Sequence, residues 1–208
     1  MSKAKLSKSS DAWLREHHAD PYVEKSKQDG YRSRAAYKLI ELNDKHKLFK
    51  SGMKIVDLGA APGGWSQIAQ NLVTEHGKVY ALDILPMDPL PHVTFIQGDF
   101  TEDGPYQELL ELTQNKKIDW VISDMAPNMS GNSTTDQIRA LYLVELAIDF
   151  AEQVLETSGN FMAKVFHGKG SEDLIKALRK NYAQVSIRKP DASRARSSEV
   201  YVVALGKK

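Results

Sequence analysis

The chain contains no cysteine, which excludes disulfide bonds, thiolate metal sites and cysteine nucleophiles. No uninterrupted apolar run approaches the roughly 20 residues that a transmembrane helix needs. The polar start, MSKAKLSKSSDAW, also lacks the apolar stretch of a secretory signal peptide. A length of 208 residues suffices for one domain with a core of its own. We therefore expect a single cytoplasmic domain over residues 1–208 that acts as a monomer, away from membranes.

An excess of charge of one sign is also missing, because 28 Lys and Arg residues balance 27 Asp and Glu residues. The distribution is nevertheless uneven. Residues 1–38 hold nine basic against five acidic residues, residues 169–208 hold ten against four, and the stretch between them is acidic. If the fold brings both basic ends to one face, that face would attract a polyanion such as nucleic acid. Solvated chain ends account for the same charges equally well.

Seven short β-rich runs recur along the chain: KIVDLG, KVYALDI, VTFIQGD, IDWVISD, NFMAKVF, AQVSIRK and EVYVVALG. Helical periodicity is found in three stretches between them: Gln137 to Leu155, Trp65 to Val73, and Glu172 to Asn181. This alternation predicts an α/β fold, with a doubly wound, mostly parallel seven-stranded sheet covered on both faces. The last two runs are joined by a long segment without helical pattern, which predicts an antiparallel edge strand. Residues 1–50 are interpreted as a basic extension with a helix over 33–45, ahead of a core over 51–208.

The residues that follow the expected strands are the first candidates for a ligand site, because open α/β sheets bind ligands beyond the carboxyl ends of their strands. The first strand leads into 59–64, whose pattern G-x-x-x-G-G matches neither the dinucleotide fingerprint nor the P-loop. Asp83, Asp99 and Asp124 follow the next three strands. Each aspartate alone could be a helix N-cap. Together with the glycine loop, they indicate a nucleoside ligand without a pyrophosphate.

Lys164 interrupts the apolar run FMAKVF. An unpaired buried charge is costly, so this lysine must reach a partner or a cleft. The alternative is an edge-strand lysine that points to water. The helical patterns on either side of the run favour a central strand, and therefore a functional lysine.

The glycine loop and the three aspartates resemble those of class I S-adenosylmethionine-dependent methyltransferases. More specifically, the chain resembles the RrmJ/FtsJ (RlmE) family of ribosomal RNA 2′-O-ribose methyltransferases, in the segments RSRAAYKL, VDLGAAPGGWSQ, ILPMDP, QGDF, SDMAPNMSG, YLVELA, KVF and RKPDASRARSSEVY. The resemblance implies a class I methyltransferase (Rossmann-like) fold and S-adenosyl-L-methionine as the cofactor. It also implies a set of cofactor-binding residues: Gly63, Trp65, Asp83, Asp99 and Asp124.

The family carries a Lys-Asp-Lys-Glu tetrad, which falls on Lys38, Asp124, Lys164 and Glu199. A ribose 2′-hydroxyl attacks a methyl group only if a base takes its proton. The resemblance makes Lys164 that base, and burial beside a second ammonium group would favour the neutral amine that the role requires. Without the resemblance, Lys38 would be interpreted as a helix-surface lysine and Glu199 as a salt-bridged residue of an edge strand. No metal ion is expected.

Two basic segments, KSKQDGYRSRAAYK and RKPDASRAR, flank the expected site and suit an RNA backbone. The candidate RNA-binding residues in them are Arg32, Arg34, Arg194 and Arg196. The resemblance implies a uridine of large-subunit (23S) ribosomal RNA as substrate, within the assembled 50S particle, although the sequence does not separate bare RNA from a particle. An inactive RNA-binding module and a nicotinamide-dependent reductase are alternatives. The intact tetrad opposes the first, and the missing G-x-G-x-x-G opposes the second.

Overall fold

The computed structural model describes residues 20–114, 116–168 and 170–208, and a seven-stranded sheet with the order β3-β2-β1-β4-β5-β7-β6 lies at its centre. The strands are β1 (Lys54–Leu58), β2 (Lys78–Asp83), β3 (Val93–Gln97), β4 (Ile118–Ser123), β5 (Leu155–Phe166), β6 (Tyr182–Arg188) and β7 (Glu199–Lys207). The strand β1 pairs in parallel with β2 and β4, β2 pairs in parallel with β3, and β4 pairs in parallel with β5. Each of the seven β-rich runs in the sequence forms one of these strands.

The final two strands form the expected antiparallel pair at one edge of the sheet, with one difference in detail. The strand that runs against the others is β7, and it lies between β5 and β6 rather than at the edge itself. The helix α7 (Ser171–Asn181) explains this order. It carries the chain from β5 to β6, which runs parallel to β5 but leaves room for one strand between them. The strand β7 then fills this place and pairs antiparallel with both neighbours.

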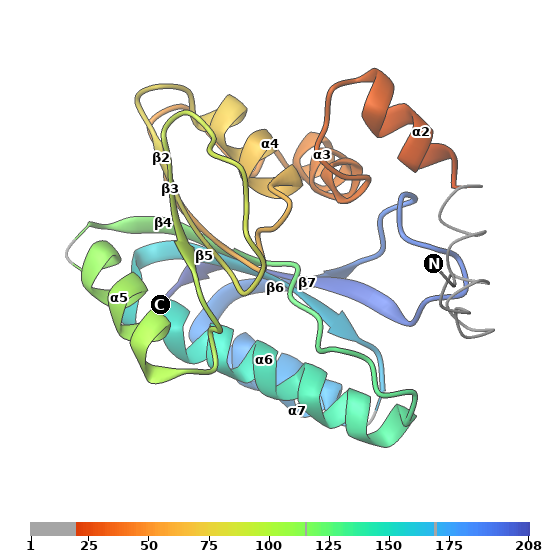
Figure 1. Cartoon of the computed structure of the whole chain (residues 1–208). Helices are drawn as coiled ribbons and strands as arrows, with labels where there is room; N and C mark the ends of the chain where they lie inside the picture. The colour runs from red at the N-terminus through yellow and green to blue at the C-terminus, as the bar shows by residue number, and fades with distance from the viewer. Residues whose placement is uncertain (1–19, 115, 169) are drawn as a thin grey trace.

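Helices cover both faces of the sheet (Figure 1). The helices α2 (Pro21–Gln28), α3 (Ala35–His46) and α4 (Gly64–Val73) lie on one face, and α5 (Asp103–Thr113), α6 (Ser133–Val154) and α7 lie on the other. Two clusters of buried side chains result. On β4, Trp120 belongs to the cluster beneath α3 and α4, whereas the next residue, Val121, belongs to the cluster with α6. No helix in the described ranges is long and apolar enough to cross a membrane.

The helices α2 and α5 lie outside the ranges expected from the sequence. The helix α2 occupies part of the basic extension and begins with Pro21, where the Asp20 carboxylate accepts a hydrogen bond from the Tyr22 N–H at 3.0 Å. The helix α5 carries Gly104 and Pro105 in its first turn, which obscures its periodicity. Proline is tolerated there because N–H groups of the first turn have no partner within the helix.

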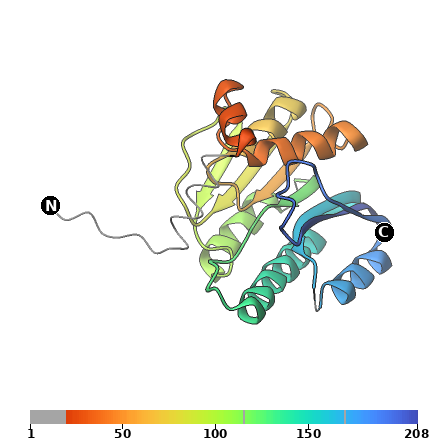
Figure 2. The ribbon, with the colours of Figure 1, turned by 90° about the vertical axis from the view of Figure 1, so that its right-hand side faces the viewer.

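The strand order reverses between β1 and β4, since β2 and β3 continue on one side and β5 on the other. Such a switch point is where α/β sheets bind ligands. The Asp124 N–H donates to the Leu58 carbonyl at 3.1 Å, which joins the ends of the two strands. The segment between β6 and β7 rises beside α3 (Figure 2), where Arg34 Nη2 donates to the Ala192 carbonyl at 2.6 Å. This segment and α3 therefore form one wall beside the switch point.

Candidate functional site

Four charged side chains from four different elements converge at the switch point. Lys38 lies on α3, Asp124 follows β4, Lys164 lies on β5, and Glu199 begins β7. Lys164 Nζ lies 3.1 Å from Asp124 Oδ1 and donates to the Asp124 backbone oxygen at 2.6 Å. Lys38 Nζ lies 2.7 Å from Glu199 Oε1 and 3.9 Å from Asp124 Oδ1. The structure thus brings together all four residues that the sequence assigned to the tetrad.

The cluster is largely removed from solvent, since Lys38 and Lys164 are only 6% and 8% exposed. Burial alone would raise the pKa of Asp124. The ammonium groups of Lys164 and Lys38 outweigh burial and, with a hydrogen bond from Tyr201, hold that pKa below its usual range. Asp124 is therefore a carboxylate at neutral pH. Two buried cations beside two carboxylates satisfy the requirement that buried charges be paired.

Two members of the cluster had no role in the sequence analysis, namely Tyr201 and Ser193. The Tyr201 hydroxyl donates to Asp124 Oδ1 at 2.7 Å and accepts a hydrogen bond from Lys38 Nζ at 3.0 Å. Ser193 Oγ donates to Glu199 Oε1 at 3.0 Å. Strand alternation is the signal that could have found Tyr201, because residues two apart on a strand face the same side. Ser193 lies in a loop and carries no comparable local signal.

The loop after β1 brings bare backbone to the switch point. Gly59 has φ of 78°, and a Cβ there would lie 2.7 Å from Met125 Cγ. Gly63 has φ of 106° and caps α4, and a Cβ there would lie 2.9 Å from Arg32 Nη1. Both positions therefore require glycine. The loop ends at the amino terminus of α4, whose first N–H groups have no intrahelical partners and can bind an anionic group.

Asp83 and Asp99 lie at the carboxyl ends of the next two strands, as expected, and both already accept hydrogen bonds. The Asp83 carboxylate accepts from the N–H groups of Ala61 and Leu85, each at 2.8 Å, and so joins the loops that follow β1 and β2. Asp99 Oδ1 accepts from the Thr101 N–H at 2.8 Å and from the Thr101 hydroxyl at 2.7 Å. Because each carboxylate oxygen accepts more than one hydrogen bond, both groups retain capacity for a ligand.

The side chain of Trp65 belongs to the core. It is 3% exposed, its indole N–H donates to the Ala35 carbonyl at 2.8 Å, and its ring centroid lies 5.6 Å from that of Tyr201. These contacts join α4 to α3 and β7. A cofactor contact by Trp65 would therefore come from its backbone N–H in the first turn of α4.

Asp57 is a buried acid beneath the glycine loop that the sequence analysis did not single out. Its Oδ2 accepts a hydrogen bond from Ser66 at 2.7 Å, and its Oδ1 has no hydrogen-bond partner within the described ranges. Burial raises the pKa of Asp57 to about 7; the Ser66 hydrogen bond opposes the increase, and the charges of Asp124 and Asp83 add to it.

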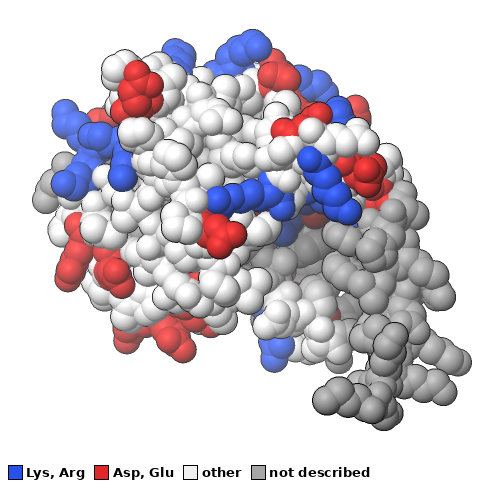
Figure 3. Space-filling view, turned by 45° about the horizontal axis from the view of Figure 1, so that its top comes forward, with Lys and Arg blue, Asp and Glu red and all other residues white. Residues whose placement is uncertain are grey.

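The candidate RNA-binding arginines Arg32, Arg34 and Arg194 lie close to acceptor groups of the protein itself. Arg32 donates to the carbonyls of Asp88 and Pro89 at 2.6 and 2.8 Å. Arg34 and Arg194 approach the same Asp20 carboxylate, at 2.8 and 3.7 Å. The fourth candidate, Arg196, is exposed. On the face shown in Figure 3, Lys and Arg side chains are mixed with Asp and Glu side chains. A role of these arginines in RNA binding stays a prediction.

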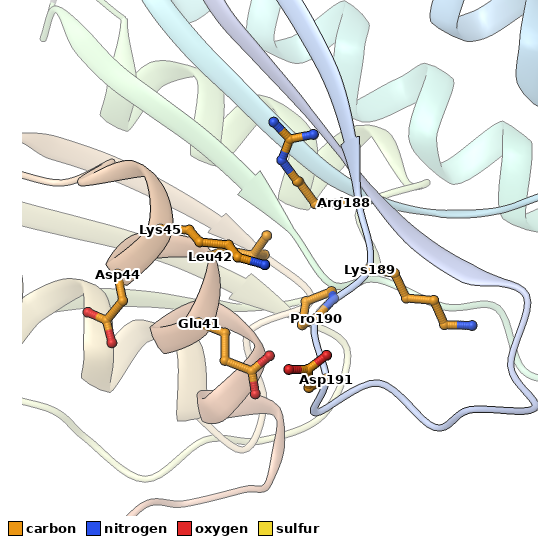
Figure 4. Close-up of a pocket in the computed structure, with 8 residues that line it drawn as sticks. All are labelled: Glu41, Leu42, Asp44, Lys45, Arg188, Lys189, Pro190 and Asp191. Atoms are coloured by element: carbon orange, nitrogen blue, oxygen red, sulfur yellow. The ribbon is translucent and has the colours of Figure 1, made fainter.

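A pocket of about 350 Å³ lies between α3 and the segment that follows β6 (Figure 4). It is lined by Glu41, Leu42, Asp44, Lys45, Arg188, Lys189, Pro190 and Asp191. Its three carboxylates balance its three cations, so it offers no net charge to a phosphate. None of the candidate catalytic or cofactor-binding residues lines it, and it is therefore separate from the site at the switch point.

The family model described as FtsJ-like methyltransferase matches residues 31–207, which include the whole sheet and all four charged residues of the cluster. The chain belongs to this methyltransferase family. It is 60% identical over 200 residues to the ribosomal RNA large subunit methyltransferase E of Cellvibrio japonicus, covering 96% of this chain and 95% of that protein. It is 56% identical over 208 residues to the protein of the same name from Alcanivorax borkumensis, covering all of both chains.

A solved structure supports the same assignment. The crystal structure of a protein described as a ribosomal RNA methyltransferase from Plasmodium falciparum superposes with a TM-score of 0.75 and 34% sequence identity. The match covers 85% of this chain and 98% of that one. The seven-stranded sheet therefore has the fold of a methyltransferase.

Proposed function

We propose that this chain transfers a methyl group from S-adenosylmethionine to the ribose 2′-hydroxyl of a uridine in large-subunit ribosomal RNA, within the assembled 50S particle. The observation that carries the proposal is the buried cluster of Lys38, Asp124, Lys164 and Glu199 beside the glycine loop. The names of the relatives support the class of substrate. Such a substrate would be met in the cytoplasm.

The residues around the glycine loop fit the cofactor. S-adenosylmethionine supplies a methyl group on a positively charged sulfur. The open backbone between Gly59 and Gly63 would run along its methionine portion, and the N–H of Trp65 would face the carboxylate. Asp83 would accept hydrogen bonds from the ribose hydroxyls and Asp99 from the adenine amino group.

Lys164 is the proton acceptor in this proposal. A neutral amine has two hydrogens and one lone pair. The backbone oxygen and Oδ1 of Asp124, at 2.6 and 3.1 Å, can take both hydrogens, which directs the lone pair away from Asp124. When the lone pair accepts the proton of the ribose hydroxyl, the Asp124 carboxylate stabilises the positive charge that develops on Lys164. Lys38 remains paired with Glu199 and does not compete for that proton.

The test supplies labelled S-adenosylmethionine to two substrates in parallel: large ribosomal subunits from a strain that lacks the modification, and free 23S RNA. Alkaline hydrolysis then reveals the product, because a methylated 2′-hydroxyl cannot attack the adjacent phosphate and leaves a labelled dinucleotide uncut. We expect label in the particle with the wild-type chain and none with Lys164→Ala.

Each part of the proposal can fail separately. Transfer to free RNA at the rate seen with particles would overturn the requirement for an assembled particle. No resistant dinucleotide from either substrate would overturn the reaction itself. Binding of a nicotinamide dinucleotide in preference to S-adenosylmethionine, measured by calorimetry, would favour a reductase instead.

A further inference from the structure

The Tyr201 hydroxyl lies at the centre of the charged cluster, although the side chain itself carries no charge. Its side chain is fully buried at 0% exposed, and its ring packs against that of Trp65. The hydroxyl lies 2.7 Å from Asp124 Oδ1, 3.0 Å from Lys38 Nζ and 3.4 Å from Glu199 Oε1. One oxygen atom therefore contacts three of the four charged residues.

The fourth charged residue, Lys164, is the direct cross-strand neighbour of Tyr201. In the antiparallel pair of β5 and β7, Lys164 lies opposite Tyr201, and Phe166 lies opposite Glu199. Directly paired residues project their side chains from the same face of a sheet. The sheet register thus fixes the tyrosine beside the proposed base.

The direction of the hydrogen bonds follows from the chemistry of the partners. Lys38 can only donate, so the phenolic oxygen accepts from it. The single hydroxyl hydrogen is then donated to Asp124, the nearer of the two carboxylates. Burial, followed by the charges of Asp124 and Glu199, raises the pKa of Tyr201 well above its usual value, so the hydroxyl keeps this hydrogen at all working pH values.

Two ion pairs result, and the hydroxyl separates them. Lys38 pairs with Glu199 at 2.7 Å and Lys164 pairs with Asp124 at 3.1 Å, whereas Lys38 and Asp124 remain 3.9 Å apart. Tyr201 and Lys164 bind the same oxygen of Asp124. The hydrogen bond from Tyr201 draws charge from that oxygen and so weakens its hold on a proton of Lys164.

We propose that Tyr201 is a positioning residue for methyl transfer, whose hydroxyl keeps the Lys164–Asp124 pair apart from the Lys38–Glu199 pair and tunes the proton affinity of Lys164 through Asp124. This inference rests on the proposed function. The charged groups that bear on the titration are Lys38 and Lys164 beside Asp124, Glu199 beside Tyr201, and Asp57, whose charge interacts with that of Asp124.

The first test is Tyr201→Phe, which removes one oxygen atom and keeps the ring. Single-turnover rates on large subunits should fall about 10- to 100-fold, the range expected for losing a hydrogen bond to a charged group. The midpoint of the rate against pH should move to higher pH, because Asp124 then holds the proton of Lys164 more strongly. The Kd for S-adenosylmethionine and the KM for particles should stay within about twofold of the wild-type values.

A matched control is Tyr182→Phe, since Tyr182 is 1% exposed and its hydroxyl has no partner within the described ranges. Both its rate and its midpoint should equal those of the wild type. A second variant carries 3-fluorotyrosine at position 201, which keeps the hydroxyl and makes it a stronger donor. Its midpoint should move to lower pH, opposite to the shift in Tyr201→Phe, and this arm applies even if the Phe variant does not fold.

The outcomes separate this inference from the proposed function. A wild-type chain that labels no dinucleotide overturns the proposed function and this inference with it. An active wild type beside variants at position 201 whose midpoints do not move overturns this inference alone. A loss of rate in Tyr201→Phe without any shift of midpoint would show that the hydroxyl does not tune Lys164, and would equally count against the proposal.

Discussion

At the residue scale, Asp83 holds together the two loops between which the cofactor would lie, because its carboxylate accepts the N–H groups of Ala61 and Leu85. Asp83→Ala removes these bonds together with the proposed bonds to ribose hydroxyls. Hydrogen bonds to a charged group contribute about 1.5–3 kcal/mol. We expect S-adenosylmethionine to bind roughly 10- to 100-fold more weakly, as measured by calorimetry, with circular dichroism to confirm the fold. Unchanged affinity in a folded variant would refute the role of Asp83.

A second prediction at this scale concerns Asp57, because burial raises its pKa from 3.8 to about 7. Between these values the folded chain keeps a proton that the unfolded chain has lost. The free energy of unfolding that depends on this retained proton is fully present below about pH 4 and is lost as pH rises toward 7. Asp57→Asn abolishes the titration. Relative to this variant, the wild type should lose up to about 4 kcal/mol of unfolding free energy between pH 4 and pH 8.

Urea denaturation at several pH values measures this difference directly. The Asn substitution also changes hydrogen bonding at Ser66, but that cost is the same at every pH. Only the pH dependence of the difference therefore bears on the claim. Parallel stability curves for the two proteins would show that Asp57 is ionised in the folded chain.

At the scale of elements, Arg32 joins the segment that leads into α3 to the loops that follow β1 and β2. Its guanidinium donates to the carbonyls of Asp88 and Pro89 at 2.6 and 2.8 Å and to that of Pro62 at 3.3 Å. These carbonyls lie after β2 and β1, so a single side chain spans both loops. The same segment continues into the helix that presents Lys38.

We therefore expect Arg32→Ala to weaken S-adenosylmethionine binding about tenfold by calorimetry, the effect of losing about one net hydrogen bond. The comparison is Arg196→Ala, whose arginine is exposed. This variant should leave cofactor affinity intact and lower the salt slope of RNA binding by about 0.7–0.9, the effect of one lost phosphate contact. Normal cofactor affinity with a reduced salt slope in Arg32→Ala would instead make Arg32 an RNA contact.

Element types were predictable from the sequence where burial leaves a local pattern. The inner strands have nearly continuous apolar runs because both their faces are covered. The edge strands β3 and β6 are more exposed and were identified from their β-rich composition. The helix α5 was not, because Gly104 and Pro105 occupy its first turn. The position of β7 between β5 and β6 was not predictable either, since strand order depends on tertiary packing rather than on local composition.

At the scale of the whole molecule, that strand order decides which side chains meet. Antiparallel insertion of β7 places Glu199 and Tyr201 beside β5, and α3 lies over them to supply Lys38. A sequence pattern indicated only Lys164 and the strand-end aspartates, because a charge in an apolar strand is unusual. Lys38 and Glu199 came from family resemblance. Tyr201 went unnoticed because a tyrosine in a strand is ordinary core composition.

The role of Lys164 as proton acceptor is tested most directly by single-turnover methyl transfer to large ribosomal subunits. The rates to compare are those of the wild type, Lys164→Ala and Lys164→Arg. Removal of a general base costs about 10²- to 10⁴-fold in rate. Arginine stays protonated and cannot accept the ribose proton, so it should fail as completely as alanine. Cofactor affinity should be nearly unchanged in both variants, because the proposed cofactor site is formed by the glycine loop and the strand-end aspartates, which both substitutions leave intact. If Lys164→Arg instead retains most of the activity, then Lys164 serves only as a positive charge, and the proton acceptor is another group.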